Sequence, residues 1–528
     1  STDSTAAPSA ARARLRRLMN LYALVLALIV LALLSVSVSQ VRKTRTKADY
    51  LVAGRTLPWY ILVFTLLSSW IGSGSLFAGA ENAFQNGFAA LWQAAGGWCG
   101  LLIIFFIAPR ARKFAQFTIP DLLETRYDVW ARILGAAAIL FAFTAIASYQ
   151  FKGGGDILHI IFPGLDVAAR ETFGLAAGKE HALGMVIIAV FVVLFTALAG
   201  MASVAYMDVV IGSLATLAAL LSVPFLLARV GGLSGFHAAL PPEYFQLFGN
   251  FAGPGGSAGA GFIRAMELLV PTMLLLLGNQ SIYQKFFSAR TERDARLSVV
   301  FWLGGTVLLE ILIVAIAVLG AAMFLHTPGV KAREIIPYTA RNGVPSLVGA
   351  ILVGAIFAKV ISTANNYLFS PATNLVNDVY TRFVNPDASD RKVLLVSRVL
   401  IVVLGLFALL QGTVSESILA MSLYAYTVYA AAITPVVLAA FFWRRATAAG
   451  AVVCILAGTA ITIVWNLQQL ALEAHRSTFL PASWLARDAI FPALLVSVVS
   501  LVVVSLLTPA PAREKWLPFA ATDAEAPG

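Results

Sequence analysis

The segment that decides the fold runs from Ser362 to Tyr380, STANNYLFSPATNLVNDVY, and follows the apolar run GAILVGAIFAKVI at 349–361. Lys359 lies about 14 residues into an apolar stretch, which is roughly 21 Å along a helix in a hydrocarbon layer about 30 Å thick. A charge at that depth needs a partner or a task. Ser362 and Thr363 follow one helical turn later on the same face. This combination predicts an ion site.

The composition places the chain in a lipid bilayer. Its 528 residues are 59% hydrophobic and 12% charged, which does not fit a soluble globular protein. The formal net charge is +11, but Lys and Arg lie in short loops between apolar runs, where they set membrane orientation, so we expect no nucleic-acid partner. Cys99 and Cys454 offer no metal spacing, and no catalytic or nucleotide motif is found, so we expect neither an enzyme nor a cofactor.

The apolar runs predict an all-α membrane protein with about 13 transmembrane helices. We divide the chain into a polar tail (1–17), a first span with a cytoplasmic linker (18–56), a transporter core (57–442), two C-terminal spans (443–508) and a C-terminal tail (509–528). The predicted spans are 18–40, 57–80, 88–109, 131–157, 183–200, 204–229, 263–283, 298–324, 345–370, 393–412, 418–442, 447–467 and 488–508.

The distribution of positive charge predicts the orientation. Alternate loops, beginning with 41–56 and including 284–297, hold 21 of the 37 Lys and Arg residues, whereas the opposite set, with the N-terminal tail, holds 11. Because cytoplasmic loops carry the excess of positive charge, we expect the first set to face the cytoplasm. This places the N-terminus outside and the C-terminus inside a cytoplasmic (plasma) membrane.

Two of the predicted spans contain interruptions. The sequence SSWIGSGSLFAGA places Gly72–Ser75 in the middle of the second span, and GNQSIYQ, at 278–284, follows Pro271 in the seventh. Unwound backbone at this depth is tolerated where it lines a cavity, and its carbonyl groups can bind a cation. The alternative is that these small residues permit close helix packing. The second break comes five spans after the first, which predicts an inverted repeat of 57–229 and 263–442.

Four phrases carry a family resemblance: DYLVAGRTLPW (49–59), APRARKFAQFTIPDLLETRY (108–127), GNQSIYQKFFSARTERDAR (278–296) and STANNYLFSPATNLVNDVY (362–380). In this order and spacing the chain resembles the sodium/solute symporter family, which includes proline, sugar, pantothenate and iodide carriers. The resemblance implies a leucine-transporter-type 5+5 inverted repeat, with one extra span before it and two after it. It also implies secondary active symport of a small polar organic solute with a cation by alternating access.

The resemblance further implies a cation site between the first break and the ninth span. Its members would be the backbone carbonyls of Ser68, Ile71 and Lys359 and the hydroxyls of Ser362 and Thr363, with Asp208 nearby. Family members typically have a small residue where this chain has Lys359, which puts the sodium site in doubt.

We therefore hypothesise that an ion pair between Lys359 and Asp208 replaces the sodium ion. Cyclic protonation of the lysine would give proton coupling, and a permanent pair would give an exchanger or facilitator. In the alternative, the lysine side chain snorkels toward water and sodium is still bound. Asp208 is either close to this cation site or, in the alternative, a helix-entry residue near the cytoplasmic face.

The resemblance implies substrate contacts by Ser75, Gln93, Thr272 and Tyr424, to which we add Gln280 of the second break. Sugar carriers have a carboxylate at the position of Ala94, which argues against a sugar.

Other buried charges leave alternatives open. Lys152 and Asp156, at i and i+4, are either a charged end of the substrate pocket or the outer end of a span. Glu81 and Glu310 are also buried acidic residues, and either could carry a proton. In the alternative, Glu81 faces the outer vestibule, and Glu310 is neutral and hydrogen-bonded to a neighbouring helix. A transporter-like sensor is a further alternative, although the chain ends about 20 residues after its last span, too short for a kinase domain. The sequence leaves the solute and the oligomeric state open.

Overall fold

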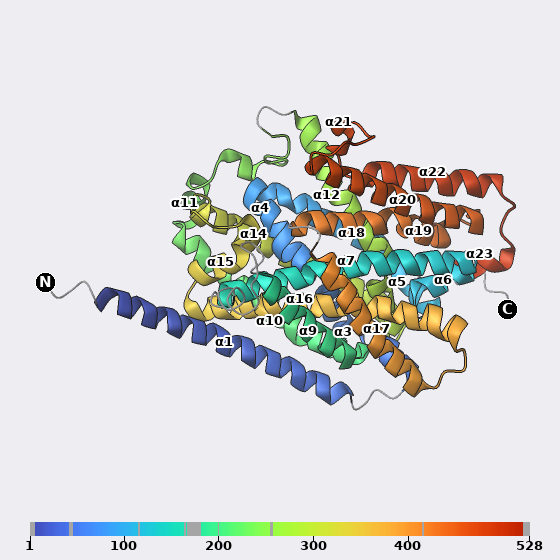
Figure 1. Cartoon of the computed structure of the whole chain (residues 1–528), viewed down its shortest axis with the longest axis horizontal. Coiled ribbons are helices and arrows are strands. Elements are labelled where there is room, and N and C mark those ends of the chain that lie inside the picture. Colours follow the sequence, from blue (N-terminus) through green and yellow to red (C-terminus); the bar gives the residue numbers. More distant parts are fainter. Residues whose placement is uncertain are drawn as a thin grey trace.

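The computed structural model describes residues 6–41, 46–114, 117–162, 165, 181–198, 200–253, 257–413 and 417–520. This described part is a bundle of helices without a β-strand (Figure 1). Eleven of its helical segments are long and apolar enough to span a membrane, and two shorter apolar helices, Trp59–Trp70 and Ala182–Leu198, coincide with two further predicted spans. The prediction of an all-α membrane protein is confirmed, while the count of thirteen spans stays a prediction.

The first half of the core begins with a broken helix. Helix α3 (Trp59–Trp70) ends where Ile71 adopts an extended conformation, and the chain continues through the π-helical segment η2 (Gly74–Gly79) into α4 (Ala80–Asn86). The remaining long helices of this half are α5 (Leu91–Phe114), α7 (Val129–Ile161), α9 (His181–Leu198) and α10 (Met201–Arg229).

The second half repeats this pattern. Helices α12 (Ala258–Gly278) and α13 (Gln280–Ser288) are separated by Asn279, whose side chain accepts hydrogen bonds from the backbone N–H groups of Ser281 and Ile282 and so caps α13. The interruption predicted in the seventh span is therefore confirmed. The other elements are α14 (Glu292–Phe324), α16 (Ser346–Asn374) with its π-helical continuation η6 (Leu375–Val384), α17 (Asp390–Gln411), α18 (Ile418–Ala432) and α19 (Thr434–Phe442).

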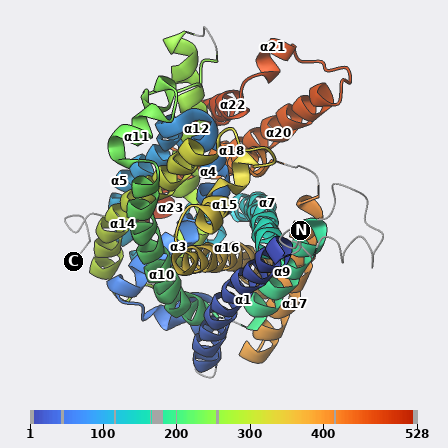
Figure 2. The same ribbon diagram turned by 90° about the vertical axis from the view of Figure 1, so that its left-hand side faces the viewer.

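The helices outside the two repeats lie at opposite edges of the bundle. Helix α1 (Ala6–Val41) crosses one side, and α20 (Ala448–Glu473) with α22 (Ile490–Leu507) cover the other, as the two views of Figures 1 and 2 show. Helix α1 begins at the left end of Figure 1, and α23 (Arg513–Ala520) lies at the right end. The two ends of the described chain are thus at opposite ends of the bundle, and the orientation of the termini in the membrane stays a prediction.

Short helices and turns connect the long helices. They are α2 (Lys47–Val52), η1 (Ala53–Arg55), η3 (Gly87–Ala90), α6 (Ile119–Arg126), α11 (Gly232–Ala238), η4 (Pro242–Phe245), η5 (Ala332–Glu334), α15 (Ile335–Asn342) and α21 (Ala482–Leu485). Helices α11 and α15 lie at the end of the bundle where α1 begins, and α6 lies at the end near α23 (Figure 1).

The helix that carries Lys359, Ser362 and Thr363 forms the centre of the bundle. In the most hydrophobic 18-residue stretch of α16 and η6, 83% of the residues are buried inside the protein. In the corresponding stretch of α1 only 17% are buried. Helix α16 packs against α1, α3, α7, α9 and α10, which surround it in Figure 2. Because protein surrounds α16 on nearly all sides, its polar side chains face other helices instead of lipid.

Candidate functional site

The first helix break lies at Ile71 and Gly72, slightly before the predicted position. Ile71 has φ −89° and ψ 107°, and the helix resumes at Ser73. A Cβ atom on Gly72 would lie 2.6 Å from the side-chain hydroxyl of Thr363 on α16, so this close approach of backbone to helix requires glycine. The prediction that the whole of Gly72–Ser75 is non-helical is wrong, because Gly74 and Ser75 belong to η2.

Oxygen atoms from α3 and α16 converge beside this break. The Oγ1 atom of Thr363 lies 2.9 Å from the carbonyl oxygen of Ser68, 3.0 Å from that of Ile71 and 2.9 Å from that of Lys359. A hydroxyl has one hydrogen to donate, so these oxygens together present more lone pairs than that hydrogen can satisfy. Carbonyl and hydroxyl oxygens are the ligands that small hard cations prefer. We call these four residues, Ser68, Ile71, Lys359 and Thr363, the oxygen cage.

Ser362 does not join the oxygen cage. Its hydroxyl donates a hydrogen bond to Oδ1 of Asp208, which is fully buried on α10. The other carboxylate oxygen of Asp208 accepts a hydrogen bond of 2.6 Å from the hydroxyl of Thr65, on the same face of α3 as Ser68. Asp208 is therefore held deep inside the bundle between α3 and α16. Asp208 lies seven residues after the first residue of α10, and its distance from the cytoplasmic face stays a prediction.

The side chain of Lys359 lies inside the bundle, next to the oxygen cage. Its Nζ atom donates a hydrogen bond of 3.0 Å to the hydroxyl of Ser68, and the residue is only 1% exposed. It does not snorkel toward water. No ion pair within 4.0 Å joins Lys359 to Asp208 in the described part of the chain, so the hypothesis of a direct pair is wrong. The hydroxyls of Ser68 and Thr65, about one turn apart on α3, bind the two groups instead.

A second buried lysine was missed by the sequence analysis, which counted it among the cytoplasmic loop charges. Lys285 lies on α13 and is fully buried; its Nζ donates hydrogen bonds to the carbonyl (3.1 Å) and hydroxyl (2.9 Å) oxygens of Ser281 and to Oδ1 of Asn366 (2.8 Å). Asn366 lies seven residues after Lys359 on α16, which is about two turns further along the same face. Extending the polar face of α16 past Thr363 would have predicted a polar partner there.

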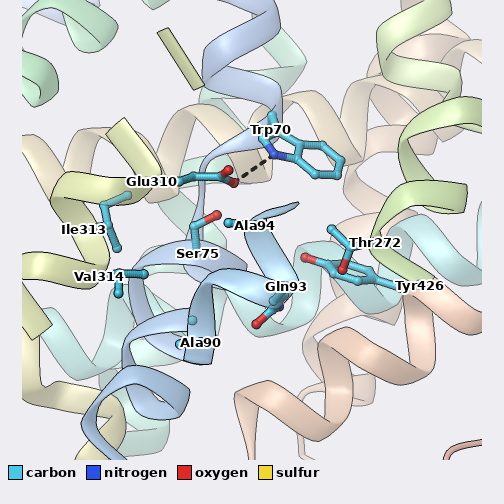
Figure 3. A pocket seen from close by; sticks show the side chains of 11 residues that line it. Trp70, Ser75, Ala90, Gln93, Ala94, Thr272, Glu310, Ile313, Val314 and Tyr426 are labelled. Atoms are coloured by element: carbon cyan, nitrogen blue, oxygen red, sulfur yellow. Dashed lines mark hydrogen bonds between the residues drawn. The ribbon is translucent and has the colours of Figure 1, made fainter. Parts of the chain in front are cut away.

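A small cavity lies between the two halves of the core, beyond the first break (Figure 3). Its volume is about 30 Å³, which is room for a few water molecules only. A larger solute therefore requires the surrounding helices to separate. The residues that line the cavity are Trp70, Ser75, Gly79, Ala90, Gln93, Ala94, Thr272, Glu310, Ile313, Val314 and Tyr426.

Three of the predicted substrate contacts, Ser75, Gln93 and Thr272, thus share one cavity. Tyr424 does not line it, and Tyr426 takes that place. Two residues are about 200° apart around an α-helix, so a tyrosine two positions away points to the opposite side of α18. Tyr424 lines a separate cavity of about 720 Å³ between α18 and the C-terminal helices, together with Thr427.

The other predicted substrate contacts lie away from the small cavity. The side-chain oxygen of Gln280 accepts a hydrogen bond from the backbone N–H of Ile119 at the start of α6. Asp156, on α7, forms an ion pair with Arg333 of η5, with 3.1 Å between Nε and Oδ2. The structure adds Arg333 as a partner that sequence reasoning missed, and Lys152 lies one turn before Asp156 on the same helix. A contact between Lys152 and Asp156 stays a prediction.

Ion pairs connect the two halves of the core at two places outside the cavity lining. The pair of Asp156 with Arg333 joins α7 to the segment that follows α14. At the end of the bundle near α23, Arg132 of α7 forms ion pairs with Asp121 and Glu124 of α6 and with Asp378 of η6, the last at 3.4 Å. Moving the two halves apart at either place would separate buried charges.

Two helices broken at mid-depth, an oxygen cage at one break and a cavity between the two halves define a secondary transporter of the leucine-transporter type. A model of the Sodium:solute symporter family matches residues 50–458, and the chain belongs to this family. It is therefore a cation-coupled transporter, not an enzyme.

Curated relatives and solved structures agree with this assignment. The osmoregulated proline transporter OpuE of Bacillus subtilis is 26% identical, with 90% of this chain and 93% of that protein aligned. The sodium/proline symporter of Escherichia coli is 25% identical, with 92% of each chain aligned. The substrate-bound, outward-open structure of a Na⁺-coupled sialic acid symporter has a TM-score of 0.72 at 16% identity over 93% of this chain and 98% of that one. The nucleobase-cation-symport transporter Mhp1, in a closed conformation, has a TM-score of 0.56 at 14% identity over 90% and 99% of the two chains.

Proposed function

We propose that this protein carries a small polar organic solute by alternating access and that the ammonium group of Lys359 takes the place of sodium. The contact of Nζ with the hydroxyl of Ser68 supports this proposal most directly, because the carbonyl of the same residue belongs to the oxygen cage. A sodium ion in the cage would lie beside a fixed positive charge. The ammonium group therefore fills electrostatically the role that a bound cation has in sodium-coupled relatives.

The coupling ion that we propose is the proton. In the described part of the chain, the Lys359 ammonium donates one hydrogen bond, to the hydroxyl of Ser68, and forms no ion pair within 4.0 Å. A lysine that is not locked in an ion pair can release its proton to one side of the membrane and take up another from the opposite side as access alternates.

The solute that we propose is small and polar. Ser75, Gln93 and Thr272 give the cavity neutral hydrogen-bonding groups, and the relatives named above include proline transporters. Ala94 lines the cavity, where a carboxylate would serve a sugar. Amino acids and related compounds are therefore the first solutes to examine. A thermal-shift screen of amino acids, carboxylates, ureas and sugars on the purified protein selects the compound for transport assays.

Transport in proteoliposomes tests the coupling ion. The selected solute is offered under a sodium gradient, a pH gradient or no gradient, and an enclosed pH-sensitive dye reports proton entry. We expect uptake to follow the pH gradient, to proceed without sodium and to acidify the interior. Uptake that strictly requires sodium would refute the proposal. Uptake that equilibrates under every condition without proton movement would indicate a facilitator instead.

We also propose that the protein lies in the cytoplasmic membrane with its N-terminus outside. The distribution of Lys and Arg supports this orientation. Single cysteines at Thr291, between α13 and α14, and at Leu247, between η4 and α12, test it after Cys99 is replaced by serine. An impermeant thiol reagent added to intact cells should label Leu247→Cys only. Labelling of both positions from one side, or of Thr291→Cys alone, would contradict the orientation.

A further inference from the structure

Glu310 is a buried acidic side chain on the cavity wall for which the proposed coupling by Lys359 has no use. It lies on α14, is 5% exposed and lines the cavity, with its carboxylate directed at the indole nitrogen of Trp70 (Figure 3). Its Oε1 atom accepts a hydrogen bond of 3.0 Å from the indole nitrogen of Trp70, and its Oε2 atom accepts one of 2.7 Å from that of Trp98. A carboxylate offers about four acceptor positions, so two indole donors leave others available to a ligand.

The cavity supplies no positive charge to balance this carboxylate. None of the side chains that line it is basic, and no ion pair of the described residues includes Glu310. A buried carboxylate without a cationic partner is unfavourable, whereas one that meets a cation in the bound state contributes to affinity and selectivity. The two indole donors keep the group in one orientation, which prepares it for a ligand.

Aromatic rings beside the carboxylate fit the same kind of ligand. Trp70 and Tyr426 both border the cavity and lie on one side of it in Figure 3. Ring faces of Trp and Tyr attract cations, and Trp does so most strongly. A carboxylate with adjacent aromatic rings is a chemical environment for an ammonium group, and it is unfavourable for an anion.

We propose that Glu310 is the specificity residue of the cavity and that it selects solutes carrying an ammonium group, with Trp70 orienting its carboxylate and the rings of Trp70 and Tyr426 beside the bound cation. The inference rests on the proposed function, because it takes this cavity as the solute site. It extends that function by naming the charged group that a solute must have. Compounds of the same size with a carboxylate and no amine are rejected.

Binding to the purified protein tests this proposal with three five-membered-ring probes. L-Proline carries an ammonium and a carboxylate, pyrrolidine carries the ammonium alone, and tetrahydrofuran-2-carboxylate carries the carboxylate alone. Calorimetry should detect L-proline and pyrrolidine but not tetrahydrofuran-2-carboxylate. The nearly isosteric Glu310→Gln variant should bind pyrrolidine about 10- to 100-fold more weakly, the usual effect of losing a charged hydrogen-bond partner.

Two further variants keep the test independent of folding defects. Glu81→Gln makes the same chemical change on α4, at a residue outside the cavity lining, and should leave pyrrolidine binding unchanged. Glu310→Asp retains the charge and should restore part of the affinity that Glu310→Gln loses.

Several results would overturn the proposal. The parent protein and Glu310→Gln could bind pyrrolidine with equal affinity. The parent could also prefer tetrahydrofuran-2-carboxylate, or bind none of the three probes. A Glu310→Gln protein that binds pyrrolidine normally but no longer moves protons would identify Glu310 as a proton carrier instead. The sodium dependence of transport is a separate measurement that concerns Lys359, so failure of either proposal is recognised without the other.

Discussion

Replacing Lys359 with alanine should create a sodium site in the oxygen cage. The replacement removes the ammonium group and leaves the carbonyl oxygens of Ser68, Ile71 and residue 359 with the hydroxyl of Thr363. The Nζ atom lies 3.0 Å from the hydroxyl of Ser68, so a cation held by the carbonyl of the same residue is a close neighbour. For a cation about 4–6 Å from the ammonium, the repulsion at an effective dielectric constant of about 20 is about 3–4 kcal/mol. Sodium affinity should therefore rise by about 100- to 1,000-fold.

Radioactive sodium binding to the purified protein measures this change, and uptake with and without sodium measures its consequence for transport. Lys359→Met removes the charge but keeps much of the side-chain volume, so it separates electrostatic repulsion from the space that alanine creates. Lys359→Arg keeps the charge and should still bind no sodium. Equal sodium affinity in the parent and Lys359→Ala would refute the reasoning, because it would show that the ammonium group does not control the cage.

Two further substitutions test the cavity and its closure. Gly74→Leu should abolish solute binding while the protein still inserts, because even a Cβ atom at this position would lie 2.5 Å from the hydroxyl of Tyr426. The control is Gly304→Leu on α14, where a Cβ atom meets nothing within 4 Å. Normal transport by Gly74→Leu would contradict the site. Arg333→Met should weaken closure around the buried carboxylate of Asp156, because removing one partner of a buried ion pair costs about 3–5 kcal/mol of stability. Hydrogen–deuterium exchange should then become faster in residues 327–334. Exchange at the parent rate would show that this pair does not hold the closed state.

Sequence reasoning was most successful where one helix decides the outcome. The i, i+3 and i+4 spacing of Lys359, Ser362 and Thr363 placed them on one face, and the structure has this face toward α3 and α10. The positions of both helix breaks followed within a residue or two from Gly72 and from the polar run after Gly278. Local conformational preference and the absence of water in a bilayer are strong constraints, and both are read along the chain.

Sequence reasoning was less successful where the partner of a side chain lies on another helix. The choice of Tyr424 over Tyr426 and the assignment of Lys285 to a loop both depended on how a helix is rotated and on where it ends. Glu310 left two alternatives open, because nothing near it in the sequence indicates the two indole groups that bind it. These features depend on helix rotation, which is set by packing against all neighbours at once.

The sequence by itself determined that this chain is a helical membrane transporter with two broken helices and a lysine deep inside one span. The low content of charge, the length of the apolar runs and the helical period are sufficient for the membrane class, the breaks and the buried lysine, whereas the transport function rested on the family resemblance. Only the tertiary structure decided that Lys359 contacts Ser68 and not Asp208, and that Asp156 pairs with Arg333, 177 residues away. The physical reason is that a buried polar group bonds to whichever complementary atom packing brings within about 3 Å, and sequence distance does not limit that choice.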